Sequence, residues 1–123
     1  PQSVHQFGGY KVQGRGEAGQ RLILDAKHMQ QAGAFATVLE VVPSDLAEAV
    51  TRAVAIPTIG IGAGPHTDAQ VLVWQDMMGL TPGPGPKFVK RYADLRTVMT
   101  DAVQTWASEV VGGVYPGPEH QYR

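Results

Sequence analysis

Residues 34–62 read AFATVLEVVPSDLAEAVTRAVAIPTIGIG, and this stretch decides the fold. Its first six residues form a short, nearly continuous apolar run, which is typical of a strand covered on both faces. TIGIG (58–62) predicts a second buried strand that runs into a glycine-rich turn. Between them, Ser44 can cap a helix whose apolar side chains recur every three or four positions. These side chains are Leu46, Ala49, Val50, Ala53 and Val54.

The flanking sequence extends this strand, helix, strand order. Residues 17–32 predict an amphipathic helix through Ala18, Leu22, Ala26 and Met29, and Gly33 is placed to end it in a left-handed conformation. Residues 70–80 contain VLVW, which fits either a third strand or a buried helical segment; we favour the strand. Residues 1–16 and 81–86 are typical of loops, and the last ten residues are expected to be extended.

The strongest helical pattern lies at about residues 94–111. Its apolar stripe consists of Leu95, Val98, Ala102, Val103, Trp106 and Val110. We expect Trp106 to lie in a core or an interface. Alternation of strands and helices predicts an α/β fold built from parallel strand–helix–strand units. Two or three strands of this kind leave an open edge, which natural proteins avoid, so further strands are expected from elsewhere.

The composition excludes several classes of protein. Ten basic and eleven acidic side chains give a net charge of −1, so neither nucleic acid nor an anionic membrane is an expected partner. No apolar run approaches the roughly 18 residues of a membrane span. The absence of Cys excludes thiolate metal sites and fits a reducing cytoplasm. The chain begins at Pro1 without Met, which leaves open that it is part of a larger protein.

Glu40 is the main candidate for chemistry. In a parallel α/β barrel, catalytic groups stand at the carboxyl ends of the strands, and Glu40 directly follows the first apolar run. A carboxylate there is expected to be partly desolvated and to accept a proton from a carbon next to a carbonyl. The alternative is that Glu40 only caps the following turn or pairs with a basic loop residue.

Other candidate sites have weaker support. The glycines of IGIGAG (59–64) could expose N–H groups to a phosphate, but they lack a phosphate-loop spacing, and making room at a crowded barrel end is the favoured interpretation. The histidines at positions 5, 28, 66 and 120 are too widely separated to predict a local metal site. Lys87, Lys90 and Arg91 are expected to lie on a solvated helix face.

Several strings resemble ketopantoate hydroxymethyltransferases, in the same order and over essentially the whole chain. GGYKVQGR and VLE-x-VP are the most distinctive of them. The strings are PQSVHQFGGYKVQGR (1–15), AGAFATVLEVVP (32–43), IPTIGIGAGP (56–65), DAQVLVWQDMMGL (68–80) and PKFVKRYADL (86–95). The resemblance implies that residues 1–123 are the C-terminal half of a single (β/α)8 TIM barrel, whose N-terminal half is absent from this chain.

The same resemblance implies an activity. A hydroxymethyl group would be transferred from 5,10-methylenetetrahydrofolate to α-ketoisovalerate to give ketopantoate in pantothenate biosynthesis. Glu40 would be the catalytic base, and Val73 would line the keto-acid pocket. Mg²⁺ would bind the keto acid and stabilise its enolate, with metal ligands in the missing half. Separately from the resemblance, the glycines of the loop from Gly8 to Arg15 and its position before a helix predict that this loop, with Tyr10, covers the active-site mouth.

Two positions depart from the family pattern. Val41 stands where many relatives have Cys, and Gln75 replaces a common His, so no proton-transfer role is expected at position 75. The resemblance also implies a large homo-oligomer, commonly a decamer, with Trp106 and Tyr115 near an interface. An alternative from another class is a non-catalytic half-domain that serves oligomer assembly or metabolite binding. A third interpretation takes the IGIGAG glycines as the phosphate site of a different barrel enzyme.

Overall fold

The computed structural model describes residues 5–6 and 17–122, which divide into two units at residues 72 and 73. The first unit contains α1 (Glu17–Gln31), β1 (Thr37–Glu40), α2 (Ser44–Ala53), β2 (Thr58–Ile61) and β3 (Ala69–Gln70). The second contains α3 (Trp74–Met77), α4 (Leu95–Val111) and a 3-10 turn, η1 (Pro118–His120). Each unit is described by itself below.

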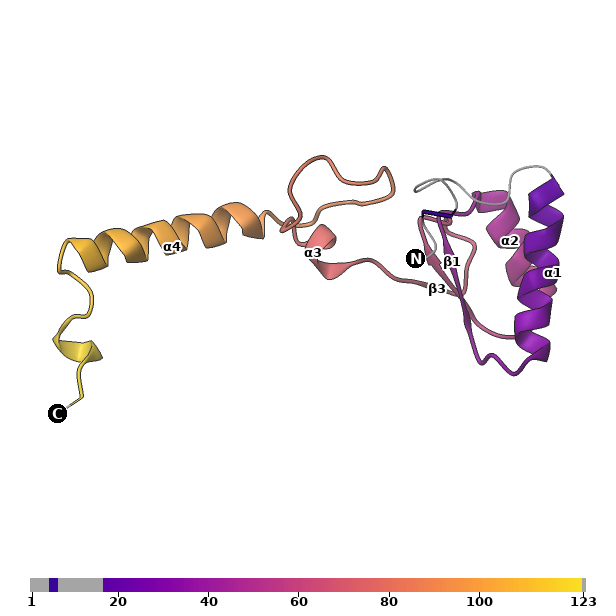
Figure 1. The fold of residues 1–123 in the computed structure, drawn as a ribbon, viewed down its shortest axis with the longest axis horizontal. Helices are drawn as coiled ribbons and strands as arrows, with labels where there is room; N and C mark the ends of the chain where they lie inside the picture. Colours follow the sequence, from indigo (N-terminus) through magenta and orange to yellow (C-terminus); the bar gives the residue numbers. More distant parts are fainter. Residues whose placement is uncertain (1–4, 7–16, 123) are drawn as a thin grey trace. The chain divides into compact units, whose positions relative to one another are not determined.

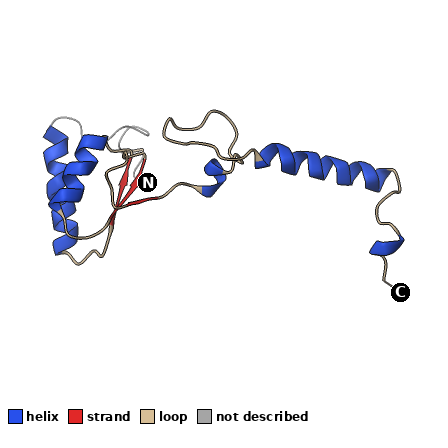
Figure 2. Ribbon diagram, turned by 180° about the vertical axis from the view of Figure 1, so that it is seen from behind, coloured by secondary structure: helices blue, strands red, loops and turns tan. Residues whose placement is uncertain are grey.

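The first unit is a parallel three-stranded sheet in the order β1-β2-β3. Thr37 pairs with Thr58 and Glu40 with Ile61, so β1 and β2 run in step over their whole length. Helices α1 and α2 lie together on one side of this sheet (Figures 1 and 2). This arrangement confirms the predicted α/β class and the parallel strand–helix–strand units.

A small core joins the sheet to the two helices. Its buried members come from α1, β1, α2 and the two turns that follow the strands, and Leu22, Ile23, Leu46 and Val54 pack around them. Along β1 the side chains alternate between buried and exposed. Leu39 is only 4% exposed, whereas Val38 is 55% exposed. The members of the core are Ala26, Leu39, Val42, Ala47, Val50 and Ala63.

This alternation corrects the expectation that the first strand is covered on both faces. Within the described residues, helices cover only the face that carries Leu39, and Val38 stays exposed on the other. The strand also begins later than predicted, at Thr37, and it includes Glu40. Phe35 lies before it and is 90% exposed. A continuous apolar run indicates that both faces of the strand are to be buried, but it does not identify the segment that buries each face.

The helix boundaries agree with the sequence except at α2. Gly33 follows α1 with a φ of 95°, as a left-handed helix end requires. Ser44 was expected to cap α2, but Pro43 occupies the cap position and Ser44 is the first helical residue. No side chain caps this helix, so the predicted cap is wrong by one position. Proline, with a φ of −53° and no N–H to satisfy, is compatible with the turn into the helix.

The VLVW segment is not the strand that we favoured. Strand β3 ends at Gln70, and one further ladder bond runs from the Val71 N–H to the Gly60 carbonyl at 3.0 Å. The chain then enters the short helix α3, whose first bonds are donated by Asp76 and Met77 to the Val73 carbonyl. A short apolar run cannot distinguish strand from helix by its period, and here the backbone bonds favour a turn of helix.

Helix α4 matches the predicted range, but its surroundings differ from expectation. Asp94 caps it by accepting the Thr97 N–H, so the preceding residues 86–93 form turns and loop. The basic cluster is exposed, as predicted, but the prediction that it lies on a helix face is wrong. Arg91 instead donates to the carbonyls of Thr81, at 3.0 Å, and Gly83. The Lys90 ammonium lies 5.0 Å from the centre of the Tyr92 ring.

The end of the chain is not extended. After Gly113, with a φ of 67°, the backbone turns and forms η1, in which the His120 N–H donates to the Gly117 carbonyl at 3.0 Å. The His120 imidazole accepts the Gly117 N–H at 3.1 Å. Pro and Gly at four of these positions favour turns over an extended strand, which corrects our interpretation. No helix in the described part of the chain has the length and apolar character to cross a membrane.

A polar network around the buried Thr58 ties β2 to the turn before β3. Thr58 is fully buried and donates its N–H (2.8 Å) and its hydroxyl (3.0 Å) to the Asp68 carboxylate. The Thr51 hydroxyl oxygen lies 2.9 Å from the Thr58 hydroxyl oxygen. The Thr51 hydroxyl also donates to the Ala47 carbonyl at 2.8 Å. The hydrogen bonds from Thr58 lower the pKa of Asp68 below its ordinary value, because they favour the ionised carboxylate.

This network predicts an acid-dependent loss of stability. A carboxyl whose pKa is lower in the folded state stabilises the fold above its unfolded pKa of about 3.9 and loses that effect as the pH falls through the folded pKa. We expect Asp68→Asn to lower the urea midpoint at pH 7 and to show a smaller further decrease between pH 5 and pH 3. Asp25→Asn, exposed on α1, is the control and should keep the parent's midpoints. Equal acid sensitivity of Asp68→Asn and the parent would contradict the assignment.

Candidate active site

Glu40 is the last residue of β1 and lies at the carboxyl end of the parallel strands. Side chains alternate along a strand, so Leu39 packs against the helices while Glu40 and Val38 face the other way. In the register, Glu40 is the partner of Ile61, and Val38 is the partner of Ile59. The face that carries the carboxylate is otherwise apolar at these four positions.

The carboxylate of Glu40 is exposed, and it makes no hydrogen bond or ion pair with any residue that the structure describes. Among the described residues, Arg52 and Glu48 form an ion pair at 2.6 Å. The Glu119 carboxylate lies 3.5 Å from the His120 Nδ1, the nitrogen that accepts the Gly117 N–H. The alternative role of Glu40, as a turn cap or a partner of a basic residue, thus finds no support among residues 5–6 and 17–122. The same exposure corrects one expectation: these residues alone do not desolvate the carboxylate.

Val41, directly after Glu40, has a left-handed backbone with a φ of 54°. It is the one non-glycine residue with a positive φ in the described part of the chain. Such a conformation is unusual for a β-branched side chain and costs of the order of 1–3 kcal/mol, and residues of this kind concentrate at functional sites. No pattern in the sequence predicts this conformation, because a valine normally indicates extended backbone.

The glycines after β2 make room for neighbouring segments. A Cβ on Gly60 would lie 2.6 Å from the Thr67 hydroxyl oxygen, and one on Gly64 would lie 2.2 Å from that of Ser44. The Gln70 amide holds this turn by donating to the Gly64 carbonyl at 2.9 Å. These contacts support the interpretation that the IGIGAG glycines relieve crowding, and they offer no specific support for a phosphate site.

Val73 lies in the second unit, where it precedes the first turn of α3 and is 47% exposed. Gln75 is exposed, and its carbonyl accepts the Leu80 N–H at 2.8 Å. Asp76, its neighbour, accepts the Thr81 hydroxyl at 2.5 Å, which closes the turn after α3. The role of Val73 in a keto-acid pocket stays a prediction, because Glu40 belongs to the other unit.

Two further expectations concern metals and the loop before α1. Among the described residues, no group of three or more His, Asp or Glu side chains is arranged to hold a metal ion. His28 and His66 are both exposed, in α1 and in the turn after β2. The proposed lid, residues 8–15, lies outside the described residues.

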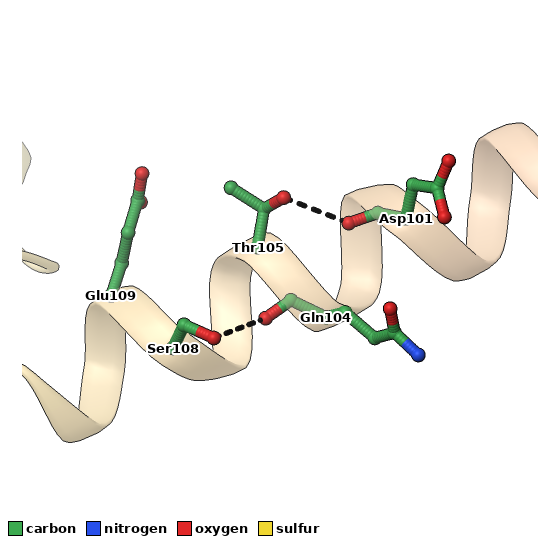
Figure 3. A pocket seen from close by; sticks show the side chains of 5 residues that line it. All are labelled: Asp101, Gln104, Thr105, Ser108 and Glu109. Atoms are coloured by element: carbon green, nitrogen blue, oxygen red, sulfur yellow. Dashed lines mark hydrogen bonds between the residues drawn. The ribbon is translucent and has the colours of Figure 1, made fainter.

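A shallow hollow on α4 does not qualify as a catalytic site. Its lining side chains come from a single helix, and two of the hydroxyls are already engaged with the helix backbone (Figure 3). Thr105 donates to the Asp101 carbonyl at 2.8 Å and Ser108 to the Gln104 carbonyl at 2.9 Å. The residues that line it are Asp101, Gln104, Thr105, Ser108 and Glu109.

Comparison with known proteins points to one family. The sequence model described as ketopantoate hydroxymethyltransferase matches residues 1–118. A 3-methyl-2-oxobutanoate hydroxymethyltransferase from Frankia alni is 64% identical over 122 residues, which are 99% of this chain and 40% of the relative. Proteins of the same name from Streptomyces coelicolor and Acidothermus cellulolyticus are 65% and 62% identical, with 98% and 99% of this chain and 41% and 45% of the relatives covered. The chain thus spans about two fifths of the length of these curated relatives.

Proposed function

Because the chain belongs to the ketopantoate hydroxymethyltransferase family, we propose that it supplies the catalytic base of an enzyme that makes ketopantoate. The enzyme transfers a hydroxymethyl group from 5,10-methylenetetrahydrofolate to α-ketoisovalerate, which is 3-methyl-2-oxobutanoate. The observation that carries the proposal is the position of Glu40. It stands at the carboxyl end of β1, on the face turned away from the helices.

The chain contributes the C-terminal half of a (β/α)8 barrel in this proposal. Parallel strands with helices on one face are the repeating unit of such a barrel, and the uncovered face becomes its interior. Val38, Ile59 and Ile61 suit that interior, because apolar branched side chains fill it. The remaining strands come from residues outside this chain, and they would also exclude the water that now reaches Glu40.

Glu40 starts the reaction by taking the proton from the carbon next to the ketone. The resulting enolate carbon forms a bond to the methylene carbon of the folate, whose two bonds to folate nitrogens break. One water supplies the hydroxyl group. The proton removed by Glu40 and the second hydrogen of the water go to the two nitrogens, so tetrahydrofolate and ketopantoate are the products. Within residues 5–6 and 17–122, no donor occupies the exposed carboxylate at the strand end, which leaves it able to accept the proton in the first step.

The Mg²⁺ that the family resemblance implies does not fit the described residues, among which no cluster of possible ligands occurs. We assign its ligands to the part of the barrel outside this chain. When bound, the ion would hold the keto acid and stabilise negative charge on its oxygen. What this chain itself contributes is the base, together with Val73 as an apolar wall of the keto-acid pocket.

Association into a homo-oligomer, a decamer by family resemblance, is part of the proposal. The apolar stripe of α4 supports it, since Val98, Val103 and Trp106 are 62%, 61% and 54% exposed. Tyr115 is 38% exposed, and the centre of its ring lies 5.1 Å from that of His120, with the two rings tilted by 48°. Exposed aliphatic and aromatic side chains in a row are typical of surfaces that become buried against other protein.

The test is a complete enzyme in which this chain replaces the matching segment of the Frankia alni relative. We call it the assembled enzyme. With Mg²⁺, it should exchange the C3 hydrogen of α-ketoisovalerate for deuterium in D2O, a reaction followed by NMR without folate, and should form ketopantoate once 5,10-methylenetetrahydrofolate is added. The chain alone should do neither, since its base is not surrounded by a barrel.

The alternative, a non-catalytic half-domain for assembly or metabolite binding, draws on the same exposed stripe of α4. It predicts that the assembled enzyme forms the oligomer of the relative, measured by light scattering, but neither exchanges the hydrogen nor forms product. An assembled enzyme with both properties would rule this alternative out.

A further inference from the structure

Val41 has a left-handed backbone conformation, and the role of Glu40 as a base does not explain it. Glycine is the usual residue at a positive φ, since it has no Cβ to clash with the backbone. At seven other positive-φ positions in the described chain the residue is glycine, and only position 41 carries a branched side chain. A side chain with a Cβ, at a position where glycine would relieve strain, calls for a functional reason.

The contacts around Val41 restrain the end of β1 on both sides of Glu40. Before the carboxylate, Leu39 is buried in the core at 4% exposure. After it, the Val41 N–H donates to the Ile61 carbonyl at 2.9 Å, which extends the ladder one residue beyond the strand. The positive φ then turns the chain, so that Val42 enters the core at 5% exposure.

The turn changes which side chain is buried. Continued alternation would bury residue 41 and expose residue 42, but Val41 is only half-buried and Val42 is buried. Glu40 therefore sits on a segment fixed at Leu39 and at Val42, and the strand ends directly after the carboxylate. A valine held at positive φ has a narrower range of backbone angles than a glycine would have there.

Resting on the proposed function of Glu40, we propose that Val41 is a positioning residue for the proton transfer. Its Cβ, which glycine lacks, restricts the backbone immediately after the base and thereby fixes the direction in which the carboxylate approaches the substrate carbon. The restriction opposes stability, because the left-handed conformation is strained. Activity and stability should therefore respond to substitution in opposite directions.

The test compares Val41→Gly and Val41→Asn in the assembled enzyme. Glycine relieves the strain but widens the backbone range, so we expect Tm to rise by about 2–4 °C. The rate constant kcat for C3 hydrogen exchange should fall about tenfold with KM unchanged, since small misplacements of a catalytic group slow the chemistry rather than binding. Asparagine tolerates the left-handed conformation and keeps a Cβ, so Val41→Asn should recover most of the parent's kcat.

Val50→Ala is the matched control for a purely structural effect. Val50 is fully buried in α2 and does not belong to the segment that carries Glu40, so its truncation should lower Tm while leaving kcat at a permissive temperature unchanged. A Val41→Gly enzyme with a parental kcat, or one in which kcat and Tm fall together, overturns the proposal.

Glu40→Gln separates this inference from the proposed function. If Glu40→Gln abolishes exchange while Val41→Gly leaves kcat unchanged, only the positioning role is wrong. If Glu40→Gln exchanges at the parental rate, the base is wrong, and the positioning role is overturned with it.

Discussion

Glu40→Gln in the assembled enzyme should lower the rate of C3 hydrogen exchange by about 10²- to 10⁴-fold, the usual contribution of a general base. Glutamine keeps the size of the side chain but cannot accept the proton. The described residues offer Glu40 no hydrogen-bond partner, so the substitution breaks no contact among them and should leave Tm within a degree or two. The measurement is loss of the C3 proton signal in D2O.

A neighbouring carboxylate supplies the control for this prediction. Glu48 lies in α2, four residues before Arg52, and its carboxylate pairs with that guanidinium at 2.6 Å. Exposed pairs of this kind contribute less than about 1 kcal/mol, and Glu48→Gln should exchange at the parental rate. Exchange that survives in the Glu40 variant but is lost in the Glu48 variant would move the base from β1 to α2.

Gly64→Ala should destabilise the first unit by about 2–4 kcal/mol, through backbone strain and overpacking together. Gly64 has a φ of 76°, and an added Cβ would lie 2.5 Å from the Cβ of Ser44 and 3.1 Å from its Cα. The second of these contacts involves backbone at the start of α2, which cannot rotate away. Urea unfolding followed by circular dichroism measures the change.

Gly33→Ala separates the two causes. Gly33 also has a positive φ, of 95°, but nothing lies within 4 Å of an added Cβ. Its substitution therefore carries only the backbone cost, about 1 kcal/mol. If both variants lose the same stability, the close approach of the turn after β2 to α2 contributes nothing, contrary to the geometry described above.

Much of the secondary structure in both units was predictable, because its signals are local. The helices over residues 17–31 and 95–111 follow from the spacing of their apolar residues. Gly33 adopts the left-handed backbone that ends the first helix, and Asp94 caps the start of the second. The position of Glu40 at a strand end follows from the apolar run before it. Each of these features depends on residues within a turn or two of the chain.

The errors have a common origin in contacts between distant segments. VLVW was read as a strand, but only one ladder bond to Gly60 extends past Gln70 before the helix begins. The interface expected for Trp106 stays a prediction, because its side chain is half-exposed within the described residues. Apolar patterning indicates which side chains are to be buried, but it does not identify the segment that buries them.

The sequence by itself determined the family, the α/β class and the identity of the candidate base, because distinctive strings and local periodicity carry that information. Only the tertiary structure decided which face of the sheet bears Glu40, that Asp68 accepts two hydrogen bonds from Thr58, and that Val41 adopts a left-handed backbone. These properties depend on how β1, β2 and the helices pack on one another. Packing energies act between residues far apart in the chain and can override the local preference of a single valine.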